Sequence, residues 1–279
     1  MTTQVPFPAP AAAAPEPPRR RGVALAVSIV TIVVGSCVAL GTVAGTAASA
    51  VSVLRDADRG SVSVDEETRG LGSLDVDVTG GALTIAYGDV ESAQLDAATG
   101  GRAGWTFERR GDALRVVSPN RSFVDWGAGS SATITLPREW AGTGLDVDAQ
   151  VSGGTLDLQG DYGAVSVRVA GGTTTLSGAA GELELGVSGG SASVQLRDVG
   201  TAAFDVAGGE ITGQLRGSTP IRTDVELAAG SVDLRLPDDE YRVSIDDGLG
   251  QVDNALRQSP TATAEVDVSA TMGEVRLRS

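Results

Sequence analysis

The chain has 279 residues, of which 41% are hydrophobic but only 4% aromatic, and it contains 38 glycines and no histidine. Residues 1–54 hold three arginines and one glutamate, whereas residues 55–279 hold 18 arginines and 35 acids, a net charge of −17. Such an acidic body repels phosphate backbones, which excludes nucleic acid as a partner. Since Cys37 is the only cysteine, the chain cannot form an intramolecular disulfide, a Cys/His metal site or a His-activated nucleophile. We therefore expect no catalytic residues, no metal and no cofactor.

The first 54 residues predict a cytoplasmic tail followed by one membrane span. Residues 1–22 are rich in proline and alanine and end in the triplet Arg19 to Arg21, so we expect a disordered tail. Residues 23–54 contain no charge, and Val23 to Val43 alone matches the roughly 20 residues of a transmembrane helix. The positive-inside rule puts the arginines in the cytoplasm. The sequence thus predicts a single-pass protein of the cell membrane, with its N-terminus cytoplasmic and its C-terminal domain extracellular.

Two alternatives accompany this span. A cleaved signal peptide would explain the small residues at Ala48 to Ala50, but its apolar region is only about 7–15 residues long, which favours a retained anchor. Within the span, Gly41 and Gly45 have the G-x-x-x-G spacing that lets two helices pack closely. The span could therefore form a transmembrane homodimer, or it could be a lipid-facing anchor without a partner. We favour the anchor without a partner because small residues are common in spanning helices.

After a linker predicted over residues 55–73, a two-strand unit recurs from residue 74 to residue 279. Each unit has an alternating apolar strand, a small-residue pair that is mostly Gly-Gly, and a second alternating strand, as in LDVDVTGGALTI from Leu74 to Ile85. Glycine allows a sharp corner there because it has no Cβ. From the second unit onward, the last inward residues of the first strands, here called anchors, are 18 to 23 residues apart. The anchors are Val78, Val151, Val169, Val187, Val206, Leu227, Ile245 and Val268.

A period near 20 residues indicates a solenoid or an array of hairpins. In a solenoid, equivalent residues stack about 4.8 Å apart, where adjacent like charges repel. Three residues before successive anchors no two acids follow one another, which favours the solenoid over a hairpin sandwich; these residues are Asp148, Ser166, Glu184, Ala203, Asp224, Arg242 and Glu265. The sequence thus predicts an all-β, β-helix-like solenoid of short-strand coils, preceded by one transmembrane helix.

Pairs of acids recur on the predicted outer face. Their i, i+2 spacing puts two carboxylates roughly 6.5–7 Å apart on one strand face, a separation that overlaps that of inverting glycosidases. A catalytic pair needs to occur only once, so recurrence favours a solvated surface. The pairs are Asp75/Asp77, Asp146/Asp148, Glu182/Glu184, Asp224/Glu226 and Glu265/Asp267. Further acids cluster between residues 238 and 247, where the sequence matches no calcium-binding motif, and solvated turns are the better interpretation.

An irregular hairpin arm, about residues 87–140, interrupts the repeat. Its segment 101–126 carries five arginines and three acids, so its net charge is positive although the rest of the domain is negative, and it also has four aromatic residues. Arginines and aromatic rings together suit a ligand with flat or anionic groups. An envelope glycopolymer or another envelope protein would offer such groups. The alternative is a hairpin around Arg110-Gly111-Asp112 that caps the first coil. The candidate ligand-binding residues are Trp105, Arg109, Arg110, Arg121 and Trp126.

The layout resembles the bacterial putative-adhesin family, also called the toastrack domain. The resemblance covers Leu74 to Leu277 and is carried by LDVDVTGGALTI, ATITLP, LDVDAQVSGGTLDL and LELGVSGGSASV. It implies a β-helical envelope domain with a surface or stress-sensing role and supplies no catalytic residues; the arm and the loss of Gly-Gly pairs after Gly209 depart from it. We therefore expect a non-catalytic, membrane-anchored module for adhesion, scaffolding or envelope sensing. The alternative is a polysaccharide-cleaving solenoid enzyme.

Overall fold

The structure, a computed structural model, describes residues 60–63, 70–98, 105–118 and 131–279, which all belong to one compact unit spanning residues 50–279. The predicted tail, the membrane span and its Gly41 and Gly45 lie outside the described residues. Within the described ranges, no helix has the length and hydropathy needed to cross a membrane.

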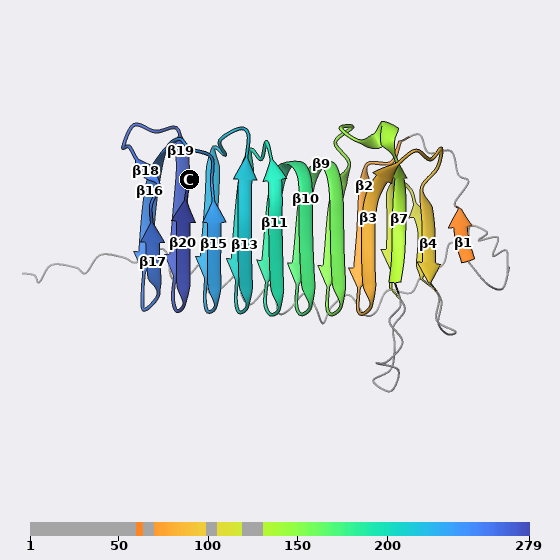
Figure 1. The fold of residues 1–279 in the computed structure, drawn as a ribbon, viewed down its shortest axis with the longest axis horizontal. Helices are drawn as coiled ribbons and strands as arrows, with labels where there is room; N and C mark the ends of the chain where they lie inside the picture. Colours follow the sequence, from red (N-terminus) through yellow and green to blue (C-terminus); the bar gives the residue numbers. More distant parts are fainter. Residues whose placement is uncertain (1–59, 64–69, 99–104, 119–130) are drawn as a thin grey trace, which may run out of the picture. The chain divides into compact units, whose positions relative to one another are not determined.

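The described chain is all-β, as predicted, apart from the single 3-10 turn η1 (Arg138–Trp140) (Figure 1). The strands are β1 (Gly60–Ser63), β2 (Ser73–Val78), β3 (Ala82–Gly88), β4 (Gln94–Ala98), β5 (Thr106–Arg110), β6 (Ala113–Val117), β7 (Ser131–Pro137), β8 (Asp146–Val151), β9 (Thr155–Val169), β10 (Thr173–Val187), β11 (Ser191–Arg197), β12 (Thr201–Val206), β13 (Glu210–Arg216), β14 (Arg222–Leu227), β15 (Ser231–Arg235), β16 (Glu240–Asp247), β17 (Gln251–Asn254), β18 (Arg257–Gln258), β19 (Ala264–Ala270) and β20 (Glu274–Arg278). β1 falls within the segment predicted to be a linker and pairs antiparallel with β4.

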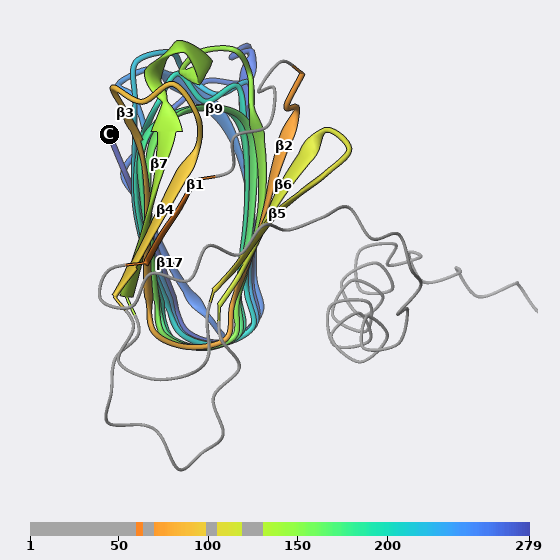
Figure 2. The same cartoon turned by 90° about the vertical axis from the view of Figure 1, so that its right-hand side faces the viewer.

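The strands form two facing walls of stacked coils, seen end-on in Figure 2. We name the walls after their outward residues, described below. The acidic side runs β5, β6, β2, β8, β9, β10, β12, β14, β19, β16. The hydroxyl side runs β1, β4, β7, β3, β9, β10, β11, β13, β15, β20, β17. β9 and β10 contribute to both sides because each continues around the bend. Apart from the antiparallel pairs β1–β4, β4–β7 and β5–β6, neighbouring strands pair in parallel and in register, which is the arrangement expected of a β-solenoid.

The coils do not follow sequence order at either end of the stack. β2 pairs on one edge with β8 and on the other with β6, so the arm forms the coil beyond β2. At the opposite end, β19 lies between β14 and β16, and β20 lies between β15 and β17. The last coil in sequence, β19 and β20, therefore lies in the stack between the two coils that precede it in sequence. Residues close in sequence are not always neighbours in the stack.

The structure also corrects two predicted anchors. Leu227 of β14 pairs with Ala270 of β19, and Ala270 pairs with Asp247 of β16. The positions in register with the other anchors are thus Ala270, which is buried, and Asp247, which is exposed; each lies two residues beyond the predicted anchor. The error arose because no Gly-Gly pair marks these corners, and alternation alone does not distinguish positions two residues apart.

Glycine is required at the corners because the coils approach closely there. Gly190 has φ +87°, and a Cβ at this residue would lie 2.2 Å from the carbonyl oxygen of Gly172 in the preceding coil. The same oxygen accepts a hydrogen bond from Ser191 N at 3.0 Å. The predicted role of the Gly-Gly pairs is confirmed, with the second glycine carrying the positive φ.

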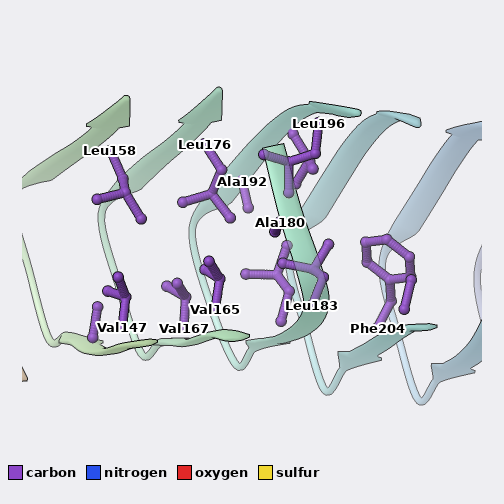
Figure 3. Packing of buried hydrophobic residues seen from close by; sticks show 14 of the residues in the cluster. Val147, Leu158, Val165, Val167, Leu176, Ala180, Leu183, Ala192, Leu196 and Phe204 are labelled. Atoms are coloured by element: carbon purple, nitrogen blue, oxygen red, sulfur yellow. The ribbon is translucent and has the colours of Figure 1, made fainter. Parts of the chain in front are cut away.

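The core fills the space between the two walls with aliphatic side chains. Figure 3 shows Val165 and Val167 of the acidic side pointing toward Leu158 and Leu176 of the hydroxyl side. All four are at most 2% exposed. The inward rows predicted from alternation are therefore buried within the stack, and every second residue is left for the outer surface. The exception is β16 at the end of the stack, where the predicted anchor Ile245 is 41% exposed.

Candidate functional site

The arm supplies an antiparallel hairpin in which β5 and β6 flank a turn at Gly111 and Asp112. β6 also pairs with β2, so the hairpin extends the acidic side beyond the first coil. Phe107 is buried in the core cluster, and Trp105 packs against the same cluster with its indole nitrogen buried. These contacts fit the capping role that the sequence offered as the alternative to ligand binding.

The predicted arginine cluster is only partly described. Arg110 forms an ion pair with Glu108 of its own strand at 2.6 Å. The Nε of Arg109 donates a hydrogen bond to the carbonyl oxygen of Gly111 at 2.8 Å. Arg121 and Trp126 lie outside the described residues, so the structure does not show whether they join the other three.

The acidic side brings carboxylates opposite one another on neighbouring strands. Asp75 of β2 faces Asp148 of β8, and Asp224 of β14 faces Asp267 of β19. The prediction that neighbouring coils avoid stacked acids is therefore wrong. It failed at Asp224 and Asp267 because it assumed sequential coils and misplaced the last anchors, and it did not include Asp75. Arginines offset part of the repulsion: Arg168 of β9 contacts Asp148 at 3.4 Å and Glu184 at 3.2 Å.

One pair of acids on this side has no arginine partner among the described residues. Asp205 of β12 lies directly opposite Glu226 of β14. Partial burial, followed by the charge of Glu184, raises the pKa of Asp205. Partial burial, followed by the charges of Asp205 and Asp224, raises the pKa of Glu226. The ionised forms of both groups are therefore unfavourable in the folded protein.

The acids between residues 238 and 247 are engaged within the fold at two positions. Asp238 pairs with Arg257 at 3.2 Å, and Asp239 accepts a hydrogen bond from the hydroxyl of Thr219 at 2.8 Å. Over the described residues, no group of three or more acids or cysteines is arranged to hold a metal ion.

The hydroxyl side carries different chemistry on the same coils. In four successive coils, β9, β10, β11 and β13 present three outward rows in register, twelve positions in all, of which only Asp157 and Glu210 are charged. We call this grid the hydroxyl patch: Thr155, Asp157, Gln159, Thr173, Thr175, Ser177, Ser191, Ser193, Gln195, Glu210, Thr212 and Gln214. A fourth row follows at the ends of these strands, outside the patch, and three of its four residues are charged: Asp161, Ala179, Arg197 and Arg216.

The twelve equivalent positions on the acidic side of these coils contain seven charges, five of them negative. The charged residues there are Arg168, Glu182, Glu184, Asp205, Arg222, Asp224 and Glu226. Over these twelve positions, the acidic side therefore carries five acids, against two in the hydroxyl patch.

Sequence reasoning missed the hydroxyl patch because it sought charged and aromatic clusters. Serine and threonine between apolar residues look like ordinary strand surface. The available signal was the set of second strands, TTTLS and SASVQ, whose outward residues lack charge while the first strands carry acids.

Comparisons with known proteins give structural similarities only. No family model and no curated protein matches the chain. A putative cell adhesion protein from Clostridium sporogenes is 13% identical with a TM-score of 0.37, covering 79% of this chain and 99% of its own. A putative adhesin from Bacteroides fragilis is 14% identical with a TM-score of 0.41, covering 78% and 97%. A putative adhesin from Parabacteroides distasonis is 10% identical with a TM-score of 0.40, covering 78% and 96%. At these values the similarity carries no argument about function, which has to come from the residues.

Proposed function

We propose that this protein is a non-catalytic binding module of the cell envelope, held by a single membrane span and displaying its solenoid outside the cell for adhesion, scaffolding or sensing. The observation that supports binding is the difference between the two walls: over twelve equivalent outward positions of four successive coils, the hydroxyl patch carries two charges and the acidic side seven. The uncharged run of residues 23–54 and the preceding arginines support the anchor.

Repetition of one chemistry from coil to coil favours an extended partner. Equivalent side chains recur about every 4.8 Å along the stack, so a polymer lying across the coils would meet the same contact several times. Many weak contacts then add up to useful affinity. The proposed partner is an envelope glycopolymer or another envelope protein.

The hairpin is a second contact surface in this proposal. Arg109 and Arg110 carry positive charge on an otherwise acidic domain, which suits anionic groups of a partner. The packing of Trp105 against the core supports a mainly capping role for the rest of the hairpin.

Binding without turnover is proposed because the paired carboxylates recur on several strands of the acidic side. They lie on β2, β8, β10, β14 and β19, which form a continuous outer surface. A glycosidase needs one pair placed around one scissile bond.

The test is retention of the full-length protein, reconstituted in liposomes, on envelope fragments of the producing cell. We expect saturable retention and no release of sugar fragments. Arg110→Ser should weaken retention mainly at low salt if the hairpin contributes, because exposed charges are screened as salt rises. Loss of all retention would overturn the binding role, and release of reducing sugar would replace it with the polysaccharide-cleaving alternative.

A further inference from the structure

The centre of the hydroxyl patch carries no charged residue. Its two central strands, β10 and β11, present six outward residues in register, Thr173, Thr175 and Ser177 opposite Ser191, Ser193 and Gln195. The two acids of the patch lie on its outer strands, Asp157 on β9 and Glu210 on β13. The Nε2 of Gln159 donates a hydrogen bond to Asp157 at 2.8 Å. The centre therefore offers hydroxyl and amide groups alone.

These hydroxyls are largely uncommitted within the fold. Thr173 and Ser191 approach each other at 3.5 Å, the limit of a hydrogen bond. The side chains of Thr175, Ser193 and Thr212 form no hydrogen bond with any residue in the described part of the chain. Each hydroxyl can donate one hydrogen bond and accept two, so the row can satisfy a ligand whose own groups do both.

Strand propensity does not account for the pattern. Threonine favours strands, but the acidic side is equally strand-forming and carries Glu184 and Asp224 at comparable outward positions of the same coils. Solubility also does not need an uncharged wall, since charged residues serve it better. The segregation of charge is thus a property of the surface and is independent of the strand fold.

The charge balance selects the class of ligand. An anionic polymer would be repelled by the net charge of −17 on residues 55–279, and a cationic one would favour the acidic side. The nearest arginines beyond the patch are already engaged: Arg197 contacts both carboxylate oxygens of Asp161 at 2.7 and 2.8 Å, and Arg216 donates to Gln214 at 2.6 Å. A neutral polymer rich in hydroxyl groups meets no such penalty on the hydroxyl side.

We infer that the hydroxyl patch binds a neutral glycan chain of the envelope, with the row of Thr175, Ser193 and Thr212 at the centre of the contact. This inference rests on the proposed binding function and names its ligand class and its surface. The chain crosses successive coils, and each coil adds one set of hydroxyl contacts at the same spacing. Affinity therefore depends on the number of coils covered and is insensitive to salt.

The experiment separates envelope polysaccharide on an anion exchanger into a neutral fraction and a retained anionic fraction. Binding of the full-length protein to each immobilised fraction is measured at low and high salt. The test variant is Thr175→Val with Ser193→Ala, which removes two hydroxyls and keeps strand-compatible side chains. The matched control, Thr201→Val with Ser269→Ala, removes one threonine and one serine hydroxyl from the outer face of the acidic side. Unfolding midpoints of all three proteins verify the fold.

We expect the wild type to bind the neutral fraction equally at both salt concentrations. The test variant should bind it about 25-fold more weakly, because each of the two lost hydrogen bonds contributes on the order of a fivefold change in affinity. The control variant should bind like the wild type. If the test variant is less stable, Thr175→Ser with Ser193→Thr, which keeps both hydroxyls, should restore binding.

Binding confined to the anionic fraction, or equal losses in the test and control variants, would overturn the glycan assignment and leave the proposed binding function standing. Failure of the wild type to bind whole envelope fragments would overturn the binding function itself. The two failures are thus distinguishable.

Discussion

Asp224 of β14 lies directly opposite Asp267 of β19, and one nitrogen of Arg222, Nη2, contacts both carboxylates, at 2.8 and 3.0 Å respectively. Nη1 of the same guanidinium is 3.5 Å from Glu265. Like charges that face each other across a strand pair destabilise a sheet unless they are neutralised. Arg242 of β16 also contacts Glu265, at 3.3 Å. Two arginines, with Arg222 at the centre, therefore allow three acids to lie together where the last coil is inserted into the stack.

Arg222→Gln should lower the free energy of unfolding by about 1 kcal/mol at low salt, since an exposed network is stronger than a single surface ion pair but still screened. The difference from wild type should shrink in high salt as screening weakens both attraction and repulsion. Urea unfolding at two salt concentrations measures both effects. Arg216→Gln is the matched control, because Arg216 contacts an uncharged glutamine, Gln214. Equal losses in the two variants would show that the acids around Arg222 do not need it.

Asp205→Asn with Glu226→Gln should stabilise the protein at neutral pH by roughly 0.5 kcal/mol, the scale of partly exposed charges. Both carboxyls have a pKa raised by burial and by neighbouring acids. Ionisation therefore favours the unfolded state, and this cost is complete above the folded pKa values. It disappears as the pH falls below the unfolded values, so the advantage of the variant should vanish in acid.

The control for this pair is Asp224→Asn, which removes a neighbouring acid that Arg222 binds. This substitution should destabilise at neutral pH, the opposite sign. Urea midpoints measured from neutral to acidic pH give the comparison. A stabilisation by Asp224→Asn as large as that of the pair would mean that general charge reduction, and not local burial, controls the effect.

Much of the solenoid follows from the sequence because its signals are local. Alternation identifies the inward rows, and Gly-Gly pairs identify the corners, as at Gly189 and Gly190. The order of the coils could not be predicted, because the insertion of β19 and β20 between the two preceding coils depends on contacts between distant segments. Gly273, three residues after Ala270 as Gly230 is after Leu227, was the one local clue to the final register.

The candidate site was less predictable than the fold. Arg109 and Arg110 stand out in the sequence because the segment 101–126 has a net positive charge within an acidic domain, yet the hairpin that carries them also closes the first coil. The hydroxyl patch becomes visible only when strands are placed in register, since no single serine or threonine is unusual. A surface formed by repetition is a property of the stack and not of any one repeat.

Gly190→Ala should destabilise the protein by about 3 kcal/mol or more, because the left-handed backbone is strained for alanine and its Cβ collides with the neighbouring coil. That Cβ would lie 2.2 Å from the carbonyl oxygen of Gly172. Gly80→Ala is the matched control at another Gly-Gly corner, where an added Cβ meets nothing within 4 Å. Thermal unfolding of both variants tests the stacking. A loss of stability in Gly190→Ala as small as that in Gly80→Ala would show that the corners accommodate a side chain by moving apart.

Thr223→Val should raise the free energy of unfolding by about 1 kcal/mol, since a buried hydroxyl without a hydrogen bond costs more than the methyl group that replaces it. Thr223 is fully buried between Ala202 of β12 and Val266 of β19, and its hydroxyl has no hydrogen-bond partner among the residues that the structure describes. Thr212→Val, on the exposed hydroxyl patch, should change stability little. A loss of stability in Thr223→Val would indicate that its hydroxyl bonds to a group that the fold leaves within reach.

The membrane topology can be tested with the single native cysteine as an internal control. Cys37 lies in the middle of the uncharged run, so a membrane-impermeant maleimide should not label the wild-type protein in intact cells. Ser188→Cys places a thiol at an exposed corner of the solenoid and should be labelled without lysis. Thr3→Cys, in the tail before the arginine triplet, should be labelled only after the cells are opened, because those arginines hold the tail in the cytoplasm. Labelling of Thr3→Cys in intact cells, or protection of Ser188→Cys, would reverse the predicted orientation and with it the proposal that the solenoid faces an extracellular partner.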